Sequence, residues 1–118
     1  MSSKSYRAVT TDLTKALGTL RKELPETTQG FSAMHNGAMK AGALSELQKE
    51  LIALAIGIAQ HCDGCIGFHV KALIRLGVTR EQFLETLAVS IYMGGGPGYM
   101  TAAEALRAYE EFTADKAA

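Results

Sequence analysis

Apolar residues recur at helical spacing almost throughout this chain of 118 residues, and no segment alternates apolar and polar residues as a half-buried strand would. The sequence contains only two prolines, and helix-favouring Ala, Leu and Glu are frequent. No internal repeat, low-complexity segment or linker divides it, and its length suits one small domain. We therefore predict a single all-α domain over residues 1–118, built from about six helices.

Local signals place the ends of these helices. Apolar positions from Leu13 to Leu24 mark a first helix that ends at Pro25, and a second runs from there until Gly42 stops it. Two capping boxes, Ser45–Gln48 and Thr79–Gln82, each predict the start of a later helix. The later helices are expected at about 47–60, 63–76, 80–93 and 99–113, the last two separated by a glycine-rich turn at 94–98.

The helix after the first capping box is amphipathic for one turn and then apolar all round, which is typical of a helix buried on every side. The last predicted helix is rich in small residues and also needs cover: Ala102, Ala103, Ala105 and Ala108. A chain this short buries only about two thirds of the surface of its unfolded state. We therefore predict a homo-oligomer.

Charge and hydropathy exclude several classes of protein. Twelve Lys and Arg balance twelve Asp and Glu, which argues against nucleic-acid binding, because phosphate neutralisation needs a surplus of basic residues. No apolar stretch approaches the roughly 20 residues of a membrane-spanning helix. The polar first residues lack the apolar core of a secretory signal, so we expect a cytoplasmic protein.

Two cysteines, Cys62 and Cys65, stand three positions apart, and in a reducing compartment such a pair is more often catalytic or metal-binding than structural. On a helix, Cys65 and His69 lie about 40° apart, so they share a face with Cys62 at or just before the helix start. The free amides at a helix N-terminus stabilise a thiolate there. The second thiol, one turn away, can then close onto the first as a disulfide.

His69 can take the proton that a thiol loses before it attacks. Glu50 lies on the preceding helix, which must pack antiparallel to this one, and its carboxylate can orient the imidazole. The predicted catalytic residues are therefore Glu50, Cys62, Cys65 and His69, with no metal and no bound cofactor. The position beside His69 favours Cys65 as the activated thiol, although the helix-dipole argument alone favours Cys62.

Other interpretations of these residues stay open at this point. The cysteines can be small buried residues, and Glu50 can be a solvated neighbour of Lys49. Cys62, Cys65 and His69, with His61, could bind structural zinc, but no second ligand cluster exists in the sequence. A further alternative is a non-enzymatic binding or redox-sensing oligomer, in which oxidation of the pair changes the assembly.

The spacing Glu50-x11-Cys62-x2-Cys65-x3-His69 resembles that of the AhpD-like alkyl hydroperoxidase family, in the carboxymuconolactone decarboxylase superfamily. The resemblance extends over about residues 44–112 and includes the glycine-rich turn and the alanine-rich last helix. It implies an all-α fold that assembles into trimers or hexamers. In AhpD proteins the cysteine pair reduces a peroxiredoxin partner, has weak peroxidase activity and receives electrons through a lipoyl carrier.

Carried over to this chain, the resemblance implies a thiol-dependent peroxidase or disulfide reductase with an antioxidant role. Glu50 and His69 would form the proton relay of its dithiol. The lactone decarboxylases of the superfamily use no such pair, which argues against that reaction. One departure is that AhpD proteins carry a histidine between the cysteines, whereas this chain has Asp63 and Gly64. Asp63 is expected to disfavour a thiolate at Cys62, and His61 to substitute only in part for the missing histidine.

Overall fold

A computed structural model describes residues 4–117, and within that range the chain forms five α-helices and no strand. The helices are α1 (Tyr6–Glu23), α2 (Pro25–Met39), α3 (Glu46–Ala59), α4 (Asp63–Arg75) and α5 (Arg80–Ala117). The predicted all-α class is confirmed.

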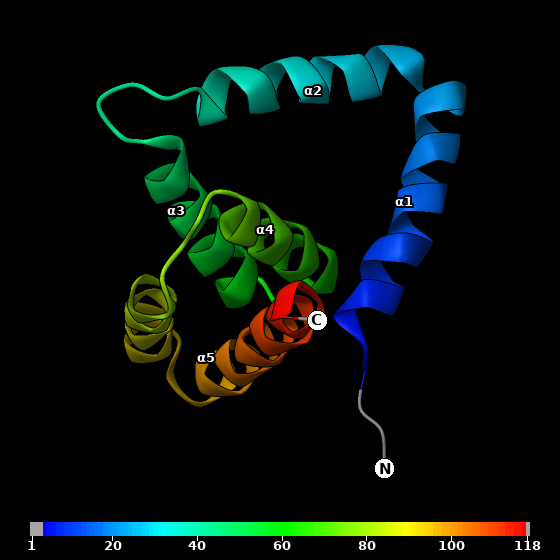
Figure 1. The fold of residues 1–118 in the computed structure, drawn as a ribbon. Coiled ribbons are helices and arrows are strands. Elements are labelled where there is room, and N and C mark those ends of the chain that lie inside the picture. Colours follow the sequence, from blue (N-terminus) through cyan, green and yellow to red (C-terminus); the bar gives the residue numbers. More distant parts are fainter. Residues whose placement is uncertain (1–3, 118) are drawn as a thin grey trace.

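The predicted number of about six helices is wrong, because the last two predicted helices are one bent element. α5 continues through the glycine-rich segment, and only Gly95 leaves the helical conformation, with φ 65° and ψ −151°. Glycine alone adopts such backbone angles without strain. Pro97 lies just after the bend, at the start of the second half of α5, where its missing N–H costs little. Figure 1 shows the resulting change of direction within α5.

The predicted capping signals are formed. At the start of α3, the Ser45 amide donates to Gln48 at 2.8 Å and the Gln48 amide donates to the Ser45 hydroxyl at 3.0 Å. Thr79 and Gln82 make the same reciprocal pair at the start of α5, at 2.9 and 3.0 Å. These bonds satisfy backbone amides that the first turn of each helix leaves without partners.

Helices α3, α4 and α5 pack into a body that holds most of the hydrophobic core. Its largest fully buried side chains are Leu54 and Ile58 from α3, Ile66, Val70 and Leu73 from α4, and Phe83 from α5. The Phe83 ring stacks on Tyr109 across the bend of α5, with 4.5 Å between the ring centroids. This body brings the end of α3 and the start of α4 together around the cysteine pair.

Helices α1 and α2 form an arm that leaves the body at the start of α1 and returns at α3 (Figure 1). Tyr6 is 2% exposed, but Leu17 and Leu20 farther along α1 are exposed, and no residue of α2 is buried. The most exposed large apolar side chains of the arm are Leu24, Phe31 and Met34. A groove of about 630 Å³ lies between the two helices.

The expectation that the apolar helix α3 is buried on every side is wrong for a single chain. Ile52 and Ile56 are 49% and 52% exposed. The cause lies in the arrangement of the elements, because α4 and α5 cover part of α3 and the arm stands away from the rest. Among residues 4–117, no helix is both long enough and apolar enough to cross a membrane.

Candidate active site

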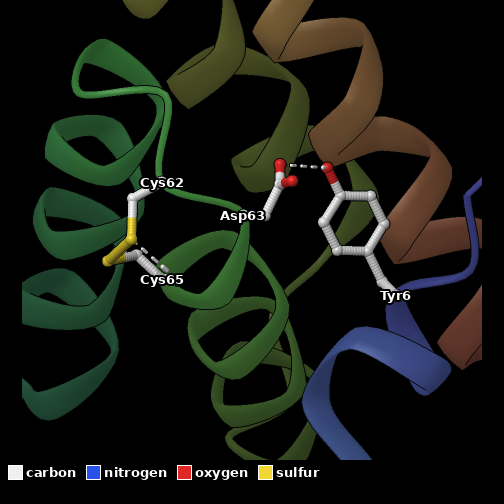
Figure 2. The surroundings of a disulfide bond; sticks show 4 residues. All are labelled: Tyr6, Cys62, Asp63 and Cys65. Atoms are coloured by element: carbon white, nitrogen blue, oxygen red, sulfur yellow. Dashed lines mark hydrogen bonds between the residues drawn. A yellow bond between two sulfur atoms is a disulfide. The ribbon is translucent and has the colours of Figure 1, made fainter. Parts of the chain in front are cut away.

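Cys62 and Cys65 are joined by a disulfide at the start of α4, with their Cα atoms 5.2 Å apart. Cys62 is the N-cap of this helix, and its Sγ accepts a hydrogen bond from the Cys65 amide at 3.1 Å. Figure 2 shows the two sulfurs side by side at the end of the helix. Both residues are half-buried. The backbone therefore points an N–H group at Cys62, which is the geometry that stabilises a thiolate once the disulfide is reduced.

The turn between α3 and α4 fixes this pair in position. The Cys62 amide donates to the carbonyl of Gly57 at 3.0 Å, and His61 turns the chain with φ 54°. Gly57 is needed for close packing, because a Cβ atom at that position would lie 3.0 Å from the Cβ of Cys65. Helix α3 thus passes directly against the second cysteine.

His61 is held by α5. Its Nδ1 lies 2.8 Å from the hydroxyl of Thr101, and that hydroxyl donates to the Pro97 carbonyl at 3.0 Å. Since the hydroxyl has only one proton, it accepts from Nδ1–H of His61. The bond anchors the turn before Cys62 to the half of α5 that follows the bend.

Glu50 and His69 form a pair behind the disulfide. Oε1 of Glu50 lies 2.6 Å from Nδ1 of His69, and Glu50 is only 4% exposed. Glu50 is therefore not the solvated residue that one interpretation of the sequence allowed. Because a carboxylate only accepts hydrogen bonds, the bond keeps a proton on Nδ1 and leaves Nε2 as the basic nitrogen. His69 follows Cys65 by one helical turn, so both project from the same face of α4.

A second group of residues, not predicted from the sequence, lies beside the Cys62–Cys65 disulfide (Figure 2). The Tyr6 hydroxyl donates its one proton chiefly to Oε1 of Glu104 at 2.8 Å, and Oδ1 of Asp63, at 3.3 Å, is the longer branch of this bifurcated hydrogen bond. Lys4 binds the same two carboxylates, at 2.9 Å from Asp63 and 2.7 Å from Glu104. No spacing rule links these residues, because they come from three segments that only the fold brings together.

Lys4 and Glu104 stabilise each other's charged forms. Hydrogen bonds to Glu104 and Asp63 raise the pKa of Lys4. The hydrogen bond from Lys4 lowers the pKa of Glu104, against the opposing effect of burial. Burial raises the pKa of Tyr6, and the hydrogen bond to Glu104 adds to that effect. Lys4 therefore stays charged and Tyr6 stays a hydrogen-bond donor around neutral pH.

The aromatic and methionine side chains around the bend of α5 do not pack into the core of the single chain. Tyr92, Met93, Tyr99 and Met100 are 57–83% exposed. Within the described part of the chain, no group of three or more His, Cys, Asp or Glu side chains is arranged to hold a metal ion.

Comparison with known proteins identifies the family. The model of the carboxymuconolactone decarboxylase family matches residues 25–108. An uncharacterised protein of Cupriavidus necator is 38% identical over 104 residues, which cover 88% of this chain and 92% of that protein. The alkyl hydroperoxide reductase AhpD of Mycobacteroides abscessus is 39% identical over 46 residues, covering 39% of this chain and 26% of that enzyme.

The structure is also similar to a crystal structure of an apo carboxymuconolactone decarboxylase family protein from Legionella pneumophila. The TM-score is 0.89 at 52% sequence identity, and the match covers 91% of this chain and 96% of that one. The chain belongs to the carboxymuconolactone decarboxylase family. Within it, the cysteine pair and the partial match to AhpD indicate an AhpD-like member.

Proposed function

We propose that this protein is a thiol-dependent peroxidase that reduces hydroperoxides through Cys62 and Cys65. The observation that carries the proposal is the buried Glu50–His69 pair at 2.6 Å, one helical turn beyond a cysteine pair that closes as a disulfide. A base fixed by a carboxylate beside a dithiol is the arrangement that thiol deprotonation requires.

The cycle begins when Nε2 of His69 takes the thiol proton of Cys65. The Cys65 thiolate attacks the terminal oxygen of a hydroperoxide ROOH, the O–O bond breaks, and His69 returns the proton to the departing RO⁻ to give ROH. The products are the alcohol and a sulfenic acid on Cys65. The Cys62 thiol then attacks that sulfur, forming the disulfide and releasing water. The peroxide has accepted two electrons and the cysteine pair has lost two.

An external dithiol closes the cycle by thiol–disulfide exchange. One donor thiolate attacks Cys62, which we assign as the exchanging sulfur because it is the N-cap of α4, whereas Cys65 lies within the helix one turn before His69. The Cys65 thiolate leaves, and the second donor thiol displaces Cys62 to give a donor disulfide and the reduced pair. The proposed donor is a lipoyl-type dithiol, and the proposed alternative acceptor of electrons is a peroxiredoxin. Both come from the resemblance to AhpD.

The test is peroxide consumption with dihydrolipoamide as reductant and with hydrogen peroxide, cumene hydroperoxide and tert-butyl hydroperoxide as substrates. We expect Cys62→Ser and Cys65→Ser each to abolish turnover, while Cys65→Ser alone also prevents the first burst of peroxide reduction. Ser90→Ala, a substitution in α5, serves as a control that keeps both cysteines. Undiminished turnover in both cysteine variants would exclude the mechanism.

A second candidate function is a redox sensor, favoured by the presence in one chain of a disulfide and of exposed apolar side chains on the arm and on α5. Size-exclusion chromatography of the oxidised and reduced protein distinguishes the two. A change of assembly on oxidation, without peroxide turnover, supports the sensor.

A further inference from the structure

Asp63 occupies an unfavourable position for a reactive thiol. It follows Cys62 directly and begins α4, so its carboxylate can compete for the same free amides and repel a neighbouring thiolate. A carboxylate beside the helix start should therefore make Cys62 harder to deprotonate. In the structure, the partners of Asp63 reduce its influence on the Cys62 thiol.

The Asp63 side chain points away from the two sulfurs. Figure 2 shows the carboxylate directed toward Tyr6 on the opposite side of the helix end from the disulfide. Its Oδ1 lies 3.3 Å from the Tyr6 hydroxyl as the longer branch of the bifurcated bond to Glu104, and its Oδ2 lies 2.9 Å from the ammonium group of Lys4. Both oxygens therefore have partners that are remote in sequence and lie away from Cys62.

The partners of Asp63 are themselves fixed by α5. Glu104 accepts from the Tyr6 hydroxyl at 2.8 Å and pairs with Lys4 at 2.7 Å. Two turns later on the same helix, Glu111 accepts from the Tyr6 amide at 2.8 Å and from the Ser5 hydroxyl at 2.6 Å. These two carboxylates lock the start of α1 against the last helix, so the Tyr6 hydroxyl has a defined position.

The charged and titratable groups around Asp63 come from two directions. Lys4 and Tyr6 approach from the start of the arm, and Glu104 and Arg107 approach from α5, where these four side chains line one small cavity. Lys4 is in direct contact with Asp63. The negative charges of Asp63 and Glu104 are thus both paired with this lysine on the side of α4 away from the cysteines.

We infer that Lys4, Tyr6 and Glu104 form a clamp that holds the Asp63 carboxylate away from Cys62 and offsets its charge, which leaves the amides at the start of α4 to stabilise a Cys62 thiolate. Lys4, Tyr6 and Glu104 are positioning residues in this scheme, because they act on the thiol through Asp63. The inference rests on the proposed function for its catalytic consequence, but the charge state of the thiol can be measured without any turnover.

The experiment measures the alkylation rate of Cys62 by iodoacetamide against pH, in the reduced protein carrying Cys65→Ser. In this background we compare Tyr6→Phe, Asp63→Asn and the double variant. Tyr6→Phe keeps the buried ring and removes only the hydroxyl, and Tyr109→Phe is the matched control, because it removes a tyrosine hydroxyl from the core far along α5. Lys4→Gln provides a second test at a position outside the core.

We expect Tyr6→Phe to raise the thiol pKa and to lower the alkylation rate at neutral pH about threefold to tenfold, since one pKa unit is a tenfold change in thiolate below the pKa. Lys4→Gln should act in the same direction. Once Asp63→Asn removes the charge, adding Tyr6→Phe should cause no further shift, and this non-additivity is the decisive result. Tyr109→Phe should leave the profile unchanged.

A folded Tyr6→Phe protein and a folded Lys4→Gln protein that both titrate like the Tyr109→Phe control would overturn the clamp. So would a shift by Tyr6→Phe that persists in full with Asp63→Asn. The proposed function fails differently: a protein without peroxide turnover that still shows the coupled pKa shifts retains the clamp and loses the peroxidase assignment.

Discussion

Glu50 on α3 and His69 on α4 are joined by a 2.6 Å contact between Oε1 and Nδ1, although 19 residues separate them in the sequence. The two helices are antiparallel neighbours, so the short turn that carries the cysteines also brings this carboxylate to this imidazole. Glu50 is 4% exposed, and an unpaired charge in a buried place is costly. The pair therefore fixes both the orientation and the tautomer of His69.

Replacing Glu50 by glutamine tests that role. Glu50→Gln keeps the size of the side chain but loses the negative charge that holds the proton on Nδ1. We expect the rate of peroxide turnover to fall about 10- to 100-fold, within the range by which a positioned base contributes, while the cysteines still form their disulfide. Stopped-flow peroxide consumption gives the rate, and titration of free thiols gives the disulfide.

Glu46→Gln is the matched control, since Glu46 lies one turn earlier on the same helix, in the first turn. It should leave turnover within about twofold of the wild type, because it does not bond to His69. Equal losses in Glu46→Gln and Glu50→Gln would contradict a specific role for the Glu50–His69 bond.

Gly57→Ala tests the close packing of α3 against the cysteine pair. A new Cβ atom would lie 3.0 Å from the Cβ of Cys65, so one helix must shift to accept it. We expect a loss of about 1–3 kcal/mol in the free energy of unfolding, measured by urea denaturation monitored by circular dichroism. Gly37→Ala on α2 meets nothing within 4 Å and should instead be neutral or stabilise by up to about 1 kcal/mol. A stabilised Gly57→Ala protein would show that α3 does not need a glycine to pack against Cys65.

The lowered pKa of Glu111 predicts that the free energy of unfolding depends on pH in the acidic range. Burial opposes its ionised form, but hydrogen bonds from Ser5, Tyr6 and Arg7 outweigh burial, so its pKa in the folded protein lies below the ordinary value of 4.5. The stabilising effect is therefore complete above pH 4.5 and is lost as the pH falls through the lower folded pKa. Unfolding by urea between pH 7 and pH 3 should show this loss.

Glu111→Gln should reduce the free energy of unfolding by about 1 kcal/mol at pH 7 and make the decline below pH 4.5 shallower. The neighbouring Glu110→Gln removes only a surface pair with Arg80 and should cost less than about 0.5 kcal/mol. If Glu111→Gln and the wild type lose stability in parallel on acidification, the carboxylate is not the titrating group.

The sequence was sufficient for the parts of this molecule that depend on local patterns. Helical spacing, the two capping boxes and the Glu-Cys-Cys-His spacing predict the all-α class, the starts of α3 and α5 and the contact between Glu50 and His69. The continuation of α5 through Gly95 was missed, because a glycine-rich segment with a proline usually ends a helix. The contact of Tyr6 with Asp63 and Glu104 was missed because 57 and 98 residues separate the partners, and no periodicity links them.

The exposed apolar side chains of the arm predict an oligomeric assembly. Phe31 and Met34 on α2 are 65% and 63% exposed in the single chain, and the groove between α1 and α2 is lined by Leu17, Leu20, Leu24 and Phe31 together with polar side chains. Burying such side chains stabilises each by about 1.5–3 kcal/mol, so a second copy of the chain gains by covering them. We expect light scattering to give a mass that is a multiple of 12.6 kDa, with a trimer or hexamer expected from the family resemblance.

The double variant Phe31→Asp/Met34→Asp should shift this mass toward 12.6 kDa, because a charge is too costly to bury in an apolar contact. Gln29→Asp is the control, since Gln29 lies about 200° around the same helix from Phe31 and should leave the assembly intact. A wild-type mass of 12.6 kDa would show that the arm stays uncovered by other copies of this chain. An unchanged mass in the double variant would place the contact between copies elsewhere, with the exposed Tyr92 and Met93 of α5 as the next surface to substitute.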